Sequence, residues 1–273
     1  MKQTPLIIGH RGACAQAPEN TVAAFQLALD VGADGVEFDV QLSSDGVPVV
    51  IHDADLNRTG LRSEKVADLT ARQLGKIDVG SGFNKKFPKK ANPDFAKETV
   101  PTLAQVLKLL KGFNGLIYIE LKCGDSDFKP LAKAVCDVIR DSPLLSQVIV
   151  KSFKLAAIPE VRHHLPEVKT AALFAPQIMD FLRRRNHIIA IAREFGADEI
   201  SLHHSLVTRR LVSLAAESQM PVTIWTADDP KWLARCSKLG IGALITNDPE
   251  NLLASRLKSA AITAILASKR VSA

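Results

Sequence analysis

The chain has 273 residues, of which 47% are hydrophobic and 23% charged, a composition typical of a globular protein with a substantial core. No apolar run reaches the roughly 18–20 residues of a membrane span, and the N-terminal apolar run is too short for a secretory signal, so we expect a cytoplasmic protein. The formal net charge of +6 suits solvated helices or an anionic partner, such as a phosphorylated small molecule or a membrane surface, whereas 5% aromatic residues and no recognisable motif argue against nucleic acid.

Short apolar segments alternate with amphipathic segments along nearly the whole chain. The pattern predicts strands at residues 6–9, 35–40, 116–121, 147–152, 169–174, 199–203, 221–226 and 242–246, mostly apolar as in parallel strands buried on both faces. Helices are predicted at 18–31, 103–112, 128–141, 154–164, 177–195, 208–218, 230–239 and 249–258, the first with Pro18 in its first turn and Gly32 at its end. Eight such units predict an α/β fold, a single (β/α)8 TIM barrel domain over residues 1–273.

Two segments depart from this alternation. Residues 47–52 follow the turn SSDG, and we expect them to form the return arm of a hairpin on the second strand, with Leu42 opposite Val47 and Glu37 opposite His52. Residues 54–100 are polar, lysine-rich and too long for an ordinary loop, so a small insertion subdomain over the barrel mouth is expected. The four cysteines lack CxxC spacing, which favours reduced thiols over disulfides or a zinc cluster.

Three carboxylates occupy strand positions where apolar residues are the rule. Glu37 and Asp39 are two residues apart and share one face of the second strand, and Glu120 lies on the next barrel strand. Carboxylates that converge inside a barrel repel one another unless a cation lies among them, and oxygen ligands favour Mg²⁺ or Ca²⁺ over zinc. We therefore predict one divalent cation, Mg²⁺ or Ca²⁺, bound by Glu37, Asp39 and Glu120. The alternative is a surface ion pair, for example between Glu120 and Lys122.

Two histidines are expected beside these acids. His10 ends the first strand, and the hairpin brings His52 to the second. Because imidazole titrates near neutral pH, such a pair predicts a general acid and a general base, in either order. His203, at the end of the sixth strand, is a further candidate for the barrel mouth.

The order of the motifs resembles that of the glycerophosphodiester phosphodiesterases, a branch of the phospholipase-C-like phosphodiesterase barrels. The resemblance runs from residue 7 to about residue 250 and is carried by HRG, PENT, GVEFDVQLSSDGVPVVIHD, PTL, IELK, SF, WT and TNDP. It implies a metal held by Glu37, Asp39 and Glu120, with His10 and His52 as acid and base. It also implies that Arg11 and Lys122 hold the phosphate, and that the insertion corresponds to the small subdomain of that family.

The resemblance implies metal-dependent hydrolysis of glycerophosphodiesters to sn-glycerol 3-phosphate and an alcohol. One alternative is a lysophospholipase D on the same scaffold, which needs an open apolar groove, whereas NKKFPKKANPDFAKE in the insertion offers little apolar surface. The other is a non-catalytic ligand-binding barrel, which would be expected to have lost one of the histidines or acids, and none is missing. A zinc amidohydrolase is disfavoured because the first strand ends in His-Arg. The sequence indicates no oligomeric state.

The sequence departs from the family pattern at positions expected on the rim. The segment GSGF at residues 80–83 lacks the tryptophan often found there, Asp228 stands where asparagine is usual, and ACAQA follows HRG. These departures are expected to bear on the alcohol side of substrate preference. Trp225 is expected either to pack against glycerol or to fill the top of the barrel.

Overall fold

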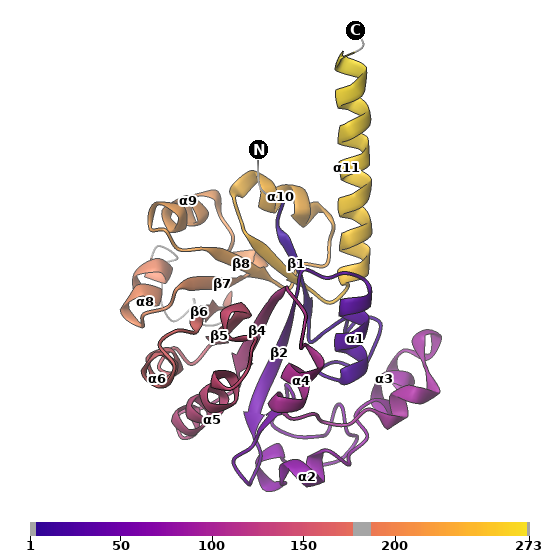
Figure 1. The fold of residues 1–273 in the computed structure, drawn as a ribbon, viewed down its shortest axis with the longest axis vertical. Helices are drawn as coiled ribbons and strands as arrows, with labels where there is room; N and C mark the ends of the chain where they lie inside the picture. Colours follow the sequence, from indigo (N-terminus) through magenta and orange to yellow (C-terminus); the bar gives the residue numbers. More distant parts are fainter. Residues whose placement is uncertain (1–3, 177–186, 272–273) are drawn as a thin grey trace.

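A ring of parallel strands forms the centre of the molecule. The structure is a computed structural model that describes residues 4–176 and 187–271, with side chains described as far as residue 261. Within these residues eight parallel strands form a closed barrel, in which each strand pairs with the next and β9 pairs with β1 (Figure 1). The strands are β1 (Leu6–His10), β2 (Gly35–Leu42), β4 (Leu116–Leu121), β5 (Val148–Ser152), β6 (Lys169–Phe174), β7 (Glu199–His203), β8 (Val222–Trp225) and β9 (Ala243–Thr246). The predicted (β/α)8 barrel is confirmed.

Helices cover the outer face of the barrel and bury its apolar wall. They are α1 (Val22–Asp30), α4 (Leu103–Leu109), α5 (Phe128–Arg140), α6 (Ala157–His164), α8 (Ile188–Glu194), α9 (Arg209–Glu217), α10 (Lys231–Leu239) and α11 (Pro249–Val271), with short 3-10 helices η4 (Leu145–Gln147) and η6 (His204–Leu206) in connections. Leu131, Val135 and Ile139 recur every four residues on α5 and are fully buried. Burial of each such side chain contributes about 1.5–3 kcal/mol, which fixes the helix against the strands.

Two helix boundaries differ from the sequence-based prediction by more than three residues. The first helix begins at Val22 rather than Pro18, because Asn20 has a left-handed backbone (φ 59°) and the Thr21 hydroxyl caps the helix by accepting a hydrogen bond from Ala24 N. The last helix continues to Val271, well past residue 258, through a stretch in which alanine, the strongest helix former, recurs. The first part of the predicted helix 177–195 lies outside the described residues. Among the residues described, no helix combines the length and apolarity that crossing a membrane requires.

The hairpin on β2 forms in a register one residue away from the predicted one. Strand β3 (Pro48–Val50) is antiparallel to β2, and Leu42 pairs with Pro48 instead of Val47. The cause is the turn, in which Ser43 N donates to Val47 O while Gly46 adopts φ 75°, so that one extra residue enters as a bulge. Glu37 therefore does not lie opposite His52, which follows the end of β3.

The insertion forms a group of short helices beside the barrel mouth. It contains η1 (Val66–Asp68), α2 (Ala71–Leu74), α3 (Ser81–Lys86), η2 (Pro88–Lys90) and η3 (Pro93–Lys97). These segments gather next to the hairpin and α1 in Figure 1, and the insertion side chains Leu56, Leu74 and Ile77 share an apolar cluster with Val49 of the hairpin. The insertion is thus anchored by packing.

The loop after β1 depends on a glycine. Gly12 has φ 80°, and a Cβ there would lie 2.6 Å from the carbonyl oxygen of Ala24 in α1. A side chain would separate the loop from α1, so glycine allows the close contact. Arg11, which also has a left-handed backbone (φ 54°), is thereby turned toward the barrel.

Candidate active site

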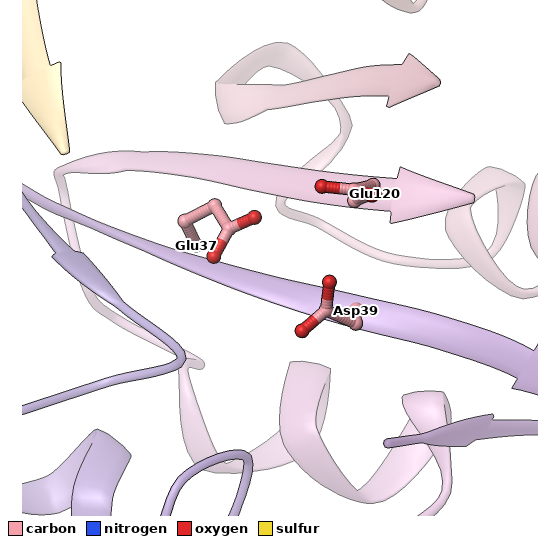
Figure 2. Close-up of side chains that lie close together, drawn as sticks. All are labelled: Glu37, Asp39 and Glu120. Atoms are coloured by element: carbon pink, nitrogen blue, oxygen red, sulfur yellow. The ribbon is translucent and has the colours of Figure 1, made fainter. Parts of the chain in front are cut away.

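Three carboxylates meet at the C-terminal half of the barrel. Glu37 and Asp39 project from β2 and Glu120 from the neighbouring β4 (Figure 2). The strand register places Asp39 beside Glu120, and the three side chains offer oxygens that all lie within 4.8 Å of one another. Their exposures are 0%, 1% and 6%, so water compensates little of their charge. The structure brings the three predicted metal ligands together.

The donor set fits a hard divalent cation. It consists of carboxylate oxygens, the ligands that Mg²⁺ and Ca²⁺ prefer. Among the described residues, the buried oxygens Glu37 Oε1 and Glu120 Oε1 each face one ammonium group, that of Lys151 and that of Lys122 respectively. A carboxylate oxygen has a further lone pair beyond this contact, and a coordinated cation would satisfy it in a site where water is excluded.

Two lysines flank the carboxylates. Lys151 of β5 is 2% exposed, and its Nζ lies 2.8 Å from Glu37 Oε1 and 3.9 Å from Glu120 Oε2. Lys122, just after β4, places its Nζ 2.6 Å from Glu120 Oε1 and 3.4 Å from Asp39 Oδ1. Sequence reasoning identified Lys122 but missed Lys151, for which a lysine inside the apolar run VIVKS was the available signal.

The ionisation of the three acids reflects their neighbours. Burial raises the pKa of Glu120 to about 7, and the charge of Asp39 acts in the same direction. Burial alone would also raise the pKa of Asp39, but Arg11 and Lys122 hold it well below its ordinary value. Glu37 is likewise desolvated, yet Lys151 keeps its pKa low. Asp39 and Glu37 are therefore stabilised as carboxylates, whereas Glu120 needs further positive charge nearby to be stabilised in the same form.

His10 is oriented by a chain of hydrogen bonds. The barrel register places it beside Glu37, with Nε2 3.9 Å from Glu37 Oε2, and its Nδ1 lies 2.7 Å from Asn247 Oδ1. Asn247 in turn donates from its backbone N and its Nδ2 to Asp228. The amide oxygen of Asn247 thus faces His10, which puts a proton on Nδ1 and leaves Nε2 directed at the acids. Burial lowers the pKa of His10 and favours the neutral ring.

Asp228 acquires a role that the sequence did not indicate. Instead of lying free on the rim, it accepts hydrogen bonds from Thr246 Oγ1 and from both nitrogens of Asn247, each at 2.8 Å. It therefore supports His10 through Asn247.

His52 is held from both sides although it lies beyond the strand. The side-chain amide of Gln41 donates to the carbonyl oxygens of Ile51, His52 and Asp53 at 3.2, 3.0 and 2.7 Å. The imidazole Nδ1 lies 2.6 Å from Asp53 Oδ1, and Arg58 Nε donates to the other oxygen of Asp53. The ring is 30% exposed and lies at the edge of the site.

Arg11 and Asn20 both contact Asp39. Arg11 Nε lies 3.1 Å from Asp39 Oδ2, and Arg11 Nη1 donates to Glu19 at 2.7 Å. Asn20 is 3% exposed and donates from Nδ2 to Asp39 Oδ2 at 3.0 Å. The motif PENT therefore supplies two groups, Glu19 and Asn20, that sequence reasoning quoted without assigning a role.

Aromatic side chains form the rim beside Lys122. Trp225 packs edge-on against Phe153 and His203, with ring centroids 5.5 and 5.1 Å away. Lys122 Nζ lies 5.8 Å from the centroid of Phe153. Trp225 and His203 thus belong to one aromatic wall, which Phe153 joins to the carboxylate cluster.

A cavity of about 380 Å³ adjoins the site on the side of the insertion. Its lining includes Asn247 and Glu19 from the barrel loops, together with Phe83 and Phe87 from the insertion. The ring of Phe83 lies 5.0 Å from that of Phe87 and 5.6 Å from that of Phe95. Phenylalanines dispersed in a lysine-rich sequence therefore gather in the folded insertion, and two of them reach the cavity lining.

Comparison with known proteins identifies relatives across the chain. The profile of the glycerophosphoryl diester phosphodiesterase family matches residues 10–251. The glycerophosphodiester phosphodiesterase of Caldanaerobacter subterraneus subsp. tengcongensis is 31% identical over 248 residues, which are 91% of this chain and 96% of that protein. The glycerophosphodiester phosphodiesterase of Bacillus altitudinis is 29% identical over 251 residues, 92% of this chain and 97% of that protein.

Solved structures of related proteins have the same fold as this chain. A phosphodiesterase from Oleispira antarctica, in complex with the product sn-glycerol-3-phosphate, has a TM-score of 0.80 at 24% identity and covers 92% of this chain and 96% of that one. The glycerophosphodiester phosphodiesterase from Agrobacterium tumefaciens has a TM-score of 0.75 at 25% identity, with coverages of 92% and 99%.

The buried lysine generates a prediction about stability. Lys151→Met should lower the free energy of unfolding in the presence of chelator by about 3–5 kcal/mol, because it leaves Glu37 buried without its ammonium. Millimolar Mg²⁺ should recover part of this loss. Urea denaturation with and without Mg²⁺ measures both effects, and Lys129→Met, which removes a lysine paired with Glu160 on the surface, is the matched control. A loss no larger than that of the control would contradict the importance of the Lys151–Glu37 pair.

Proposed function

Because the chain belongs to the glycerophosphoryl diester phosphodiesterase family, it is a phosphoric diester hydrolase, and we propose that it hydrolyses glycerophosphodiesters with one divalent cation. The products are sn-glycerol 3-phosphate and an alcohol. The observation that carries this proposal is the meeting of three buried carboxylates with His10 at the C-terminal end of the barrel. The Oleispira antarctica relative with bound sn-glycerol-3-phosphate supports the identity of the phosphorylated product.

Glu37, Asp39 and Glu120 hold the cation, Mg²⁺ or Ca²⁺, in this proposal. When bound, it neutralises the charge that develops on the non-bridging phosphate oxygens, which is often the largest contribution to such catalysis. Arg11 and Lys122 hold the phosphate from two sides. Their positions support these roles, since Arg11 lies beside Asp39 and Lys122 beside Glu120, at the edge of the cluster.

His10 and His52 carry the protons. The nucleophile, water or the glycerol 2-hydroxyl, loses its proton to one imidazole, and the other imidazole protonates the departing alkoxide. The hydrogen-bond partners favour His10 as the base, since an amide oxygen orients its neutral ring. His52 then acts as the acid, with its ring oriented by the Asp53 carboxylate.

The two substituents of the phosphate would lie on opposite sides of the site. Trp225 and Phe153 form a wall next to Lys122 that suits the carbon face of glycerol. The departing alcohol would enter the cavity between the barrel loops and the insertion. Because Phe83 and Phe87 line this cavity, a lysophospholipase D activity is the second candidate function.

The first functional prediction concerns the metal. Glu37→Ala, Asp39→Ala and Glu120→Ala should each abolish hydrolysis of glycerophosphocholine, and chelator should inactivate the unmodified enzyme until Mg²⁺ or Ca²⁺ is restored. Glu199→Gln is the matched control, because Glu199 is a buried barrel carboxylate outside the cluster, and burial raises its pKa to about 7. It should retain activity. Full activity after exhaustive chelation would exclude the metal site.

A second prediction separates proton transfer from metal binding. His10→Ala and His52→Ala should each lower kcat by about 10²–10⁴-fold, the usual contribution of a positioned acid or base. Both variants should bind the cation in calorimetry as the unmodified protein does, because neither imidazole is a proposed ligand. His164→Ala, on α6 of the outer ring, should leave turnover unchanged. Loss of metal affinity in His52→Ala would assign that histidine to the metal instead.

Substrate size generates the third prediction. Small polar head groups such as choline, ethanolamine or glycerol should be accepted broadly, because phosphate and glycerol are held independently of the alcohol. A lysolipid should be much poorer, because the cavity also contains charged groups. The test compares kcat/KM for glycerophosphocholine with that for lysophosphatidylcholine below its micellar concentration. An equal or higher value for the lysolipid would favour the lysophospholipase D alternative.

A further inference from the structure

The acidic and basic side chains that line the cavity beside the active site differ in how far they are already paired within the protein. The two carboxylates in its lining already have partners in the protein. Glu19 accepts hydrogen bonds from Arg11 and Arg58, with both of its oxygens in use. Both oxygens of Asp228 accept hydrogen bonds from Thr246 and Asn247. The cavity therefore offers no unengaged carboxylate, among the described residues, to an alcohol that carries a positive charge.

Two lysines in the same lining can still donate hydrogen bonds to a bound ligand. Lys90 Nζ donates to the carbonyl oxygen of Ala15 at 2.6 Å, which fixes this ammonium between η2 and the loop after β1 and leaves two of its three N–H groups available. Lys86 Nζ lies over the ring of Phe87, 5.2 Å from its centroid. In the described part of the chain, no carboxylate lies within ion-pair distance of either lysine.

Position connects this lining to the reaction. Two residues of the lining also contact the proposed catalytic groups: Asn247 is hydrogen-bonded to His10, and Glu19 is hydrogen-bonded to Arg11. The cavity therefore opens directly beside the proposed phosphate position. A group attached to the phosphate on this side would meet the rings of Phe83 and Phe87 with its carbon atoms. Its far end would reach the ammonium groups of Lys86 and Lys90.

We propose that this cavity is a subsite for leaving alcohols that carry an anionic group, such as a carboxylate or a further phosphate, recognised by Lys86 and Lys90. The inference rests on the proposed diester hydrolysis and specifies its alcohol. Among small polar head groups, it predicts that those with an anionic group are the better substrates. Because both lysines are exposed to solvent, the expected preference is modest, about three- to tenfold, and should weaken as salt is added.

Glycerophosphoserine and glycerophosphoethanolamine provide the matched substrates, since they differ by one carboxylate. The experiment measures kcat/KM for both with the full-length enzyme in Mg²⁺, at low and high ionic strength. The unmodified enzyme should favour the serine diester by about three- to tenfold at low salt. Lys86→Met with Lys90→Met should bring the ratio to about one and leave kcat/KM for the ethanolamine diester within about twofold, since its head group carries no anion to lose.

The neighbouring lysines supply the control. Lys85 and Lys89 belong to the same basic run but are not among the residues that line the cavity, so Lys85→Met with Lys89→Met removes the same charge without touching the subsite. This variant should keep the preference. If both double variants lowered the preference equally, its cause would be the overall positive charge of the insertion, and the proposal would be overturned. A ratio of one or below in the unmodified enzyme would also overturn it.

A binding measurement separates this inference from the proposed function. Calorimetry with the His52→Ala protein in Mg²⁺ gives the affinities for both diesters without turnover. Tighter binding of the serine diester that depends on Lys86 and Lys90 supports the subsite even if the unmodified enzyme hydrolyses neither compound, a result that would refute the proposed reaction alone. Equal affinities would refute the subsite whatever the activity.

Discussion

The structure is organised around negative charge inside the barrel. Glu37, Asp39 and Glu120 are almost fully buried within 4.8 Å of one another, an arrangement that costs several kcal/mol for each unpaired ion. Lys151, Lys122 and Arg11 approach from three other positions and supply the opposite charges. A divalent cation added to this nearly balanced set would make the site positive. The surplus would favour an anionic phosphodiester, so charges that are costly to bury prepare the barrel for its substrate.

The register of the barrel strands brings these charged groups together. His10 pairs with Glu37, Asp39 with Glu120, and Glu120 with Lys151, each across one strand boundary. Side chains alternate between the two faces of a strand, so a slip of one residue would turn the charged groups into the apolar layer under the helices. The helices therefore contribute to catalysis indirectly. Their buried faces, such as that of α5, fix the strands in the single register that brings the polar groups together.

The sequence was sufficient for the barrel and for most of the polar site, because both depend on local patterns. Apolar runs mark the strands, and charged residues at their ends are visible exceptions. Contacts between distant segments could not be predicted in this way. Lys151 was overlooked since its partner lies two strands away, and the hairpin register was wrong by one residue because a bulge at Gly46 has no unique signature. The grouping of Phe83, Phe87 and Phe95 likewise requires the folded insertion.

The hydrogen bond between His10 and Asn247 joins residues 237 positions apart in the chain. It forms across the seam where β9 closes on β1, whereas the carboxylates come from β2 and β4. Synthesis proceeds from the N-terminus, so the acids and both histidines leave the ribosome long before Asn247 does. Nearly half of the chain is synthesised between Glu120 and Asn247, and over that interval the nascent chain carries the three carboxylates without the side chain that orients His10. The cluster of carboxylates and oriented His10 is thus complete only when the final strand closes the barrel.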